Sequence, residues 1–261
     1  MSFFHNPTFK PEVFSPAGSG SWAEQQRAES VMTIGGAINK TALLLGVCVA
    51  AATATWAGIA NGLMPVFWPM LGGCLAGIVL SLIIVFKPKT APWLSLPYAV
   101  CEGVFIGAIS LLYAEMAKGT KFGGAAGTAI VFNAAICTFA TLGVMLALYK
   151  MNLIRASERF KSVMAVAGVA IGLFFLIKLG LGFFGMVPAA LTSGPWAIAI
   201  SIGVTIFAAL LLILDFDYVE QGAASGAPKH VEWYAGFALL STLVFIYLQF
   251  LRLLSLLNRR D

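Results

Sequence analysis

Three acidic side chains, Asp215, Asp217 and Glu220, end a long apolar run in the stretch LLLILDFDYVEQGA. A fourth carboxylate, Glu102, lies inside another apolar stretch, PYAVCEGVFIGAIS. Ionisable side chains within membrane segments are rare and commonly mark ion or proton pathways. A proton or a cation can bridge carboxylates that share a low-dielectric site, and calcium prefers oxygen ligands. These residues therefore suggest a proton-sensitive cation pathway, with Asp215 and Asp217 as candidate calcium ligands.

The elements that must position these acids are membrane helices. The chain is 60% hydrophobic and 10% charged, whereas soluble domains average about 45–50% and about 25%. A bilayer-spanning helix needs about 20 mostly apolar residues. The segments that meet this requirement are residues 41–60, 65–85, 97–115, 126–148, 162–185, 196–214 and 233–254. The sequence therefore predicts an all-α integral membrane protein, with a seven-helix bundle over residues 36–261 and a flexible polar cytoplasmic tail over residues 1–35.

The distribution of basic residues predicts the orientation of the bundle. Cytoplasmic segments of membrane proteins carry an excess of Lys and Arg. A cytoplasmic N-terminus leaves Lys118, Lys121 and three C-terminal arginines on the outside. It places on the inside Lys10, Arg27, Lys40, Lys87, Lys89, Lys150, Arg155, Arg159, Lys161 and Lys229. We therefore expect the N-terminus in the cytoplasm and the C-terminus outside.

This orientation places Glu102, Asp215 and Asp217 near one depth on the cytoplasmic side. Glu102 follows Pro97 by five residues, about 7–8 Å along a helix. If the sixth span continues past Leu214, residues two apart point about 200° apart, so at most one aspartate can face the interior. Two other interpretations remain open. Glu102 can be a carboxylate stabilised at a helix start, and the aspartates can belong to a solvated helix end.

Stripes of small residues suggest where helices pack closely. LGGCLAGIV in the second span and AVAGVAIG in the fifth repeat Gly and Ala at intervals near four. Such faces let two helix backbones approach in lipid. We therefore expect close packing along both spans.

Several stretches together resemble the Bax inhibitor-1 family, also called the transmembrane Bax-inhibitor-motif family, and its bacterial branch most of all. They are NPTF, MTIGGAINKTALLLGV, PYAVCEGVFIGAIS, LDFDYVEQGA and EWYAGFALLSTLVFIYLQFLRLL, and they extend over nearly the whole chain. The resemblance implies a central helix surrounded by the other helices. It also implies pH-sensitive calcium leak across a bacterial inner membrane.

The resemblance also implies roles for individual residues. In relatives, aspartates in the sixth and seventh helices form a pH-sensing gate. The sixth-helix member matches Asp217 or Asp215, with Asp217 preferred, and Glu102 matches the glutamate of the third-helix E-G motif. In the seventh helix, residues 246–249 read IYLQ, so Gln249 stands where relatives have an acid. The pair is then half missing, and Asp215, Asp217 and Glu102 must supply the carboxylates.

Two functions follow from these observations. The first is a pH-sensitive calcium leak channel or proton-coupled exchanger in the inner membrane. The alternative is a regulator or scaffold that binds another membrane protein, such as a quality-control protease, through the N-terminal tail. HExxH and GxSxG motifs are absent from the sequence, so we expect no enzyme. The scattered bases argue against a nucleic-acid partner, and no cofactor is expected apart from calcium as a bound or transported ion.

Overall fold

The computed structural model describes residues 31–120, 127–151, 156–186 and 188–258. Most of the predicted tail, residues 1–30, lies outside this part of the chain. Residues 31–33 already contact the membrane domain. The Met32 amide donates to the Ala227 carbonyl oxygen at 2.7 Å, and the Thr33 amide donates to Glu232 Oε1 at 3.0 Å. Within the described residues, contacts with the helical bundle therefore start before residue 36, the predicted boundary.

The described residues form long helices joined by short connections. The helices are α2 (Ile34–Ala60), α3 (Phe67–Phe86), a short 3-10 turn η2 (Pro88–Thr90), α4 (Ala91–Ala117), α5 (Ala129–Lys150), α6 (Glu158–Phe183), α7 (Ala189–Thr192), α8 (Gly194–Ala224) and α9 (Val231–Asn258). Within the described residues, all of these except η2 and α7 are long and apolar enough to cross a membrane. The predicted seven-helix membrane fold is confirmed.

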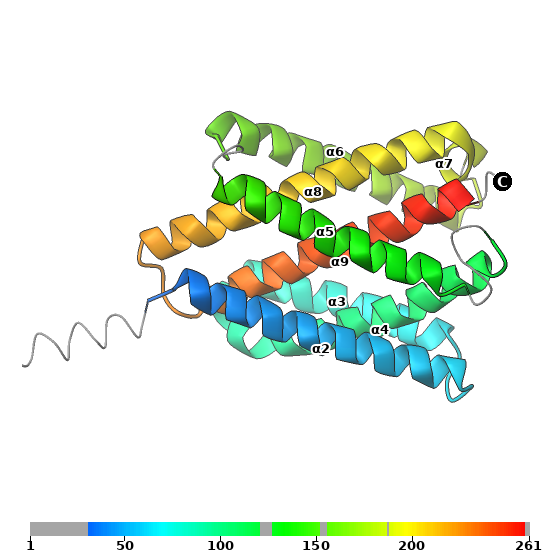
Figure 1. Ribbon diagram of the computed structural model, residues 1–261, viewed down its shortest axis with the longest axis horizontal. Helices are drawn as coiled ribbons and strands as arrows, with labels where there is room; N and C mark the ends of the chain where they lie inside the picture. Colours follow the sequence, from blue (N-terminus) through cyan, green and yellow to red (C-terminus); the bar gives the residue numbers. More distant parts are fainter. Residues whose placement is uncertain (1–30, 121–126, 152–155, 187, 259–261) are drawn as a thin grey trace, which may run out of the picture.

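Helix α9 lies at the centre of the bundle (Figure 1). It packs against α2, α4, α5 and α8, while α3 packs against α4. Its buried side chains point in several directions and include Leu240, Ile246 and Leu251. A helix that is apolar on every side can be buried on every side. The arrangement matches the central helix that the family resemblance implies.

Helix α6 lies at the edge of the bundle (Figure 1) and packs mainly against α8. Its apolar side chains are exposed on several sides, as at Val163, Val169 and Leu176. In a bilayer such a helix faces hydrocarbon rather than protein. The AVAGVAIG stripe, which predicted close packing, lies on this helix. A Cβ on Gly172 would meet nothing within 4 Å, so that expectation is wrong at this position.

Close glycine packing occurs at the helices around α4 instead. Gly73 of α3 lies against α4, where its Cβ would come within 2.8 Å of the Cys101 carbonyl oxygen. Gly103 and Gly107 of α4 lie against α2, where a Cβ would overlap with backbone carbonyl oxygens. The stripe in the second span therefore packs as predicted, and α4 supplies the closest contacts.

Two of the helix boundaries that differ from the sequence predictions concern the candidate site. The sixth span does not end at Leu214, because α8 continues through the acidic stretch to Ala224. The third span begins at Ala91, with Pro97 inside α4. Glu102 is therefore eleven residues from the helix start, about 16 Å along it, which is further along the helix than predicted.

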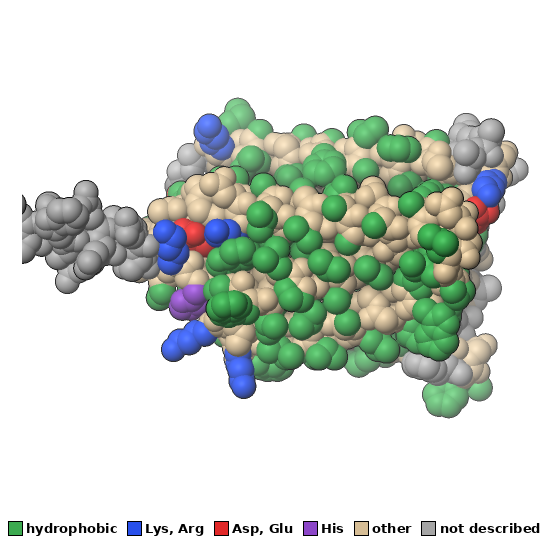
Figure 2. Space-filling view, turned by 90° about the horizontal axis from the view of Figure 1, so that it is seen from below, with side chains coloured by type: hydrophobic (Ala, Val, Ile, Leu, Met, Phe, Trp, Pro, Cys, Tyr) green, Lys and Arg blue, Asp and Glu red, His purple; other side chains and the backbone are tan. Residues whose placement is uncertain are grey.

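Charged side chains gather at the two ends of the bundle, and apolar side chains cover the surface between them (Figure 2). One end carries the start of α2 and the α8–α9 connection. The bases at this end include Lys40, Lys87, Lys89 and Lys229. The apolar band is the surface expected of a protein embedded in a lipid bilayer.

Candidate ion pathway

The carboxyl group of Asp215 points into the interface between α8 and α9. The Thr242 side chain of α9 is its hydrogen-bonding neighbour. Its second oxygen, Oδ2, is buried and has no hydrogen-bond partner among the described residues. No ion pair in the described part of the chain involves Asp215. A carboxylate in this position retains a free lone-pair site for a proton, a water molecule or a cation.

Asp215 belongs to a row of polar side chains on one face of α8. Ser201, Thr205 and Asp215 are spaced by four and ten residues, so they fall within about 80° of one another on the helix. On the facing side of α9, Thr242 and Gln249 are seven residues apart and share a face in the same way. Ser201, Thr205, Thr242 and Gln249 are all buried. These buried polar side chains lie on two helices that pack against each other, and Asp215 and Thr242 meet between them; we call the set the polar track of α8 and α9.

The track contains polar atoms that the protein itself does not satisfy. In the described residues, the buried side-chain oxygens and nitrogens without a hydrogen-bond partner are Ser201 Oγ, Asp215 Oδ2 and Gln249 Oε1. All three lie on α8 or α9. Leaving a buried polar group unpaired costs about 1–3 kcal/mol, and native proteins retain few such groups. Their concentration on two helices that pack against each other makes α8 and α9 the candidate elements of a functional path.

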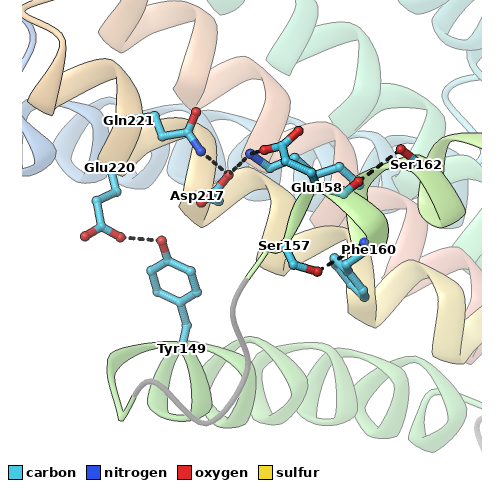
Figure 3. A network of polar contacts seen from close by, with 9 residues as sticks. Tyr149, Ser157, Glu158, Phe160, Ser162, Asp217, Glu220 and Gln221 are labelled. Atoms are coloured by element: carbon cyan, nitrogen blue, oxygen red, sulfur yellow. Dashed lines mark hydrogen bonds and ion pairs between the residues drawn. The ribbon is translucent and has the colours of Figure 1, made fainter.

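Asp217 faces away from the track, toward α6. Its Oδ2 lies 3.0 Å from Lys161 Nζ and accepts a hydrogen bond from Gln221 Nε2 at 2.6 Å. Lys161 also lies 3.1 Å from Glu158 Oε1 at the start of α6. One turn further along α8, Glu220 accepts a hydrogen bond from the Tyr149 hydroxyl of α5. Figure 3 shows that Asp217 interacts with the start of α6 and Glu220 with the end of α5.

Glu102 faces a third direction, between α4 and α3. The Tyr98 hydroxyl is its hydrogen-bonding neighbour, and its Oε1 lies 3.2 Å from where a Cβ of Gly77 would be. The same Tyr98 hydroxyl is 2.9 Å from Ser241 Oγ on α9. Because Ser241 precedes Thr242, Glu102 and Asp215 lie near the same level on either side of α9.

The predicted carboxylate cluster is therefore not assembled. Asp215, Asp217 and Glu102 lie at similar levels, but they face α9, α6 and α3 respectively. Among the described residues, no group of three or more His, Cys, Asp or Glu side chains could hold a metal ion. A cation could meet Asp215 only together with neutral oxygens such as those of Thr242 or of water.

The comparison with known families now decides the relationship. The family described as Bax inhibitor 1 like matches residues 6–259, which is nearly the whole chain. The chain belongs to the Bax inhibitor 1-like family. A search of curated proteins found no match.

The position opposite Asp215 in this Bax inhibitor 1-like chain is Thr242, and Gln249 lies elsewhere. Gln249 is seven residues further along α9, about 10 Å away. It is 5% exposed, and its Oε1 is unsatisfied. A pair between the α8 aspartate and residue 249, as the family pattern suggests, is therefore not formed. Gln249 is instead a separate polar position on the same track.

The sequence contained a signal for Thr242 that residue types alone did not reveal. Helices α8 and α9 form an antiparallel hairpin around the connection at residues 225–230. Residues at similar distances from such a connection lie near each other, and Asp215 and Thr242 are ten residues before it and twelve residues after it. The role of Lys161 was not predicted, because this residue was used only as one of the bases that orient the bundle. Its pairing with Asp217 depends on the continuation of α8 past Leu214, which was not predicted.

Proposed function

We propose that this Bax inhibitor 1-like protein is a pH-sensitive cation leak pathway, for calcium in particular, or a proton-coupled cation exchanger. The polar track between α8 and α9 is the path, and Asp215 is its ion-binding carboxylate. The observation that carries this proposal is the concentration of unsatisfied buried oxygens at Ser201, Asp215 and Gln249.

The chemistry of the track supports a cation rather than an anion. Its unsatisfied atoms are all oxygens, from a hydroxyl, a carboxylate and an amide. Oxygen ligands of these types suit calcium and other hard cations. Lys161, the base closest to this end of α8 in the ion pairs described, is engaged by Asp217 rather than by Asp215.

The pH sensitivity follows from the need for a charged carboxylate. Ionised Asp215 attracts a cation, whereas protonated Asp215 carries no charge and donates a hydrogen bond. The flux should therefore fall as the solution becomes more acidic through the titration of Asp215. Asp217 serves a different role here, since it holds α6 through Lys161. We also propose that the end of the bundle carrying Lys40, Lys87 and Lys229 faces the cytoplasm of a bacterial cell.

The test is calcium flux into proteoliposomes, measured from about pH 6 to about pH 8. Asp215→Asn keeps the size of the side chain and removes its charge. A charge-assisted interaction contributes about 1.5–3 kcal/mol, so we expect the flux to fall by about tenfold or more and to lose its pH dependence.

Asp217→Asn is the matched control, because it removes the same charge two residues away on another face of α8. We expect this variant to keep the pH dependence of the wild-type protein. Absence of calcium flux in the wild-type protein at every pH would refute the leak function. Equal pH-dependent flux in wild type and Asp215→Asn would refute the assignment of Asp215.

A further inference from the structure

A cavity of about 410 Å³ opens between α2 and α5. Among the described residues, α2 packs on α4 and α9, and α5 packs on α9 and α8, but α2 and α5 make almost no contact with each other. Figure 1 shows these two helices flanking α9. The volume falls in the range of about 300–1,000 Å³ that is typical of ligand sites.

The cavity has a buried floor and an exposed rim. Its floor includes Ser110 of α4, which is 2% exposed, and Leu243 of α9, which is 3% exposed. Its rim includes Val49 of α2 and Phe132 and Phe139 of α5, which are all exposed. The cavity is therefore a cleft that opens sideways from the bundle, between the outer surfaces of two membrane helices.

The lining offers hydrocarbon contacts and few free polar groups. Among the described residues, no charged side chain lines the cleft. The Ser110 and Tyr247 hydroxyls hydrogen-bond to each other at 2.7 Å. Thr138 donates to the Ala134 carbonyl oxygen at 2.8 Å, and Thr53 donates to carbonyl oxygens of its own helix. Apolar cavities of this kind exclude water and accept hydrocarbon.

The position of the cleft indicates that the hydrocarbon chains of bilayer lipids can reach it. Its lining residues come from the second half of α2 and the first half of α5. It therefore lies in the membrane-spanning part of the bundle, toward the end opposite Asp217 and Lys161. The exposed rim residues are apolar, like the surface between the two charged ends of the bundle (Figure 2). A lipid chain can enter sideways without crossing water or giving up its headgroup position.

We propose that the cleft between α2 and α5 is a binding site for one acyl chain of a bilayer phospholipid. The chain lies between the two helices and contacts the α9 residues Leu243, Val244 and Tyr247 at the floor. The site is separate from the α8–α9 track, because it uses other faces of α9. The proposal stands whether or not the protein conducts ions.

The test is photolabelling of the full-length protein in detergent with phosphatidylcholine that carries a diazirine midway along one chain. We expect saturable labelling at one probe per chain, on peptides of α2 and α5. Unlabelled phosphatidylcholine should compete, whereas glycerophosphocholine, which has the headgroup without chains, should not. Competition by free palmitic acid that equals that of phosphatidylcholine would assign the site to a fatty acid and overturn the phospholipid proposal.

Variants that fill the cleft provide the decisive comparison. Ala135→Trp on α5 and Thr53→Trp on α2 project an indole from opposite walls. Displacing two methylenes of the chain is enough to weaken labelling by about tenfold. Ala140→Trp, on an exposed position of α5 that is not among the residues lining the cleft, is the control and should label like wild type.

Size-exclusion profiles and circular dichroism identify any variant that fails to fold, and either filling variant suffices if the other is lost. Labelling that does not saturate, or that a folded filling variant leaves unchanged, would overturn the proposal. Equal loss of labelling in Ala140→Trp would overturn it as well.

Discussion

At the scale of single residues, the buried carboxylate of Glu232 on α9 holds the start of α2 against α9. It is the second residue of α9 and is 2% exposed. Its Oε1 accepts hydrogen bonds from the Thr33 amide at 3.0 Å and from the Thr33 hydroxyl at 3.1 Å. Thr33 is the N-cap of α2, so the carboxylate lies at the positive end of that helix. Negative charge is favourable there.

We predict that Glu232→Ala lowers the free energy of unfolding by about 1.5–3 kcal/mol, the range for hydrogen bonds to a charged group. Unfolding by denaturant in mixed micelles measures the change. Gly36→Ala should have a similar effect, because a Cβ at Gly36 would overlap with the Glu232 carboxylate. Glu115→Ala, which removes only the exposed pair with Lys118, is the control. A Glu232→Ala variant as stable as this control would contradict the prediction.

The carboxylates of the candidate site also show what residue types alone could predict. Asp215 and Glu102 were identified from the sequence because charge inside an apolar helix is costly and therefore conspicuous. Their partners were not identified, because Thr242 and Tyr98 are ordinary residues in membrane helices. Only the register between α8 and α9 distinguishes Thr242 from Gln249. That register depends on the length of the connection and the packing of both helices, which no local pattern contains.

At the scale of helices, the EWYAGF stretch of α9, one of those on which the family resemblance rests, packs against the other resembling stretches on α2 and α4. In EWYAGF, Trp233 lies over Lys40 of α2, with Nζ 4.5 Å from the ring centroid. Gly236 packs on α2, where its Cβ would come within 3.2 Å of the Thr41 amide nitrogen. Phe237 stacks edge-on against Tyr98 of α4 at 4.8 Å. These stretches therefore hold α2 and α4 on the central helix, which is a role in packing.

The packing of α2 on α4 depends on glycine, and we predict that Gly103→Ala destabilises the protein. A Cβ at this position would overlap with the Cys48 carbonyl oxygen, and backbone atoms cannot yield as a side chain can. Overpacking of this kind costs about 1–3 kcal/mol. Gly172→Ala on α6 meets nothing within 4 Å, so its effect should stay within about 0.5 kcal/mol.

Unfolding in mixed micelles compares the two variants directly. Equal stabilities for Gly103→Ala and Gly172→Ala would show that α2 and α4 separate at little cost, against the close approach described above.

The existence of each membrane helix could be predicted from the sequence, but some helix boundaries could not. Twenty apolar residues have few alternatives to a helix in lipid, so the seven spans were found. The sixth span was cut at Leu214 because hydropathy falls at Asp215. The helix continues because Thr242 and Lys161, distant in sequence, receive the two aspartates. Pro97 lies inside α4 rather than at its start, since neighbouring helices allow proline within membrane helices.

At the scale of the whole molecule, α6 is the helix least held by the rest of the bundle. It packs mainly on α8, and most of its described side chains are at least partly exposed. At its first turn, the Lys161–Asp217 pair joins it to α8 at 3.0 Å. Near its middle, Gly168 approaches only Phe207, where a Cβ would lie 3.5 Å from the ring. The polar contact therefore matters more for α6 than an equivalent pair would on a packed helix.

We predict that Asp217→Asn and Lys161→Met each speed amide hydrogen exchange in the first turns of α6, because each removes the ion pair that holds this end of the helix on α8. Hydrogen exchange with mass spectrometry in nanodiscs measures the change, and α2 and α4 should stay as protected as in wild type. The double variant should exchange no faster than Lys161→Met alone, since that substitution already removes the Lys161–Asp217 pair together with the Lys161–Glu158 pair. Additive increases would show that the two side chains act separately. Glu115→Gln breaks another Lys–Glu pair without touching α6, so faster exchange in α6 for this variant would contradict a local role for the Lys161–Asp217 pair.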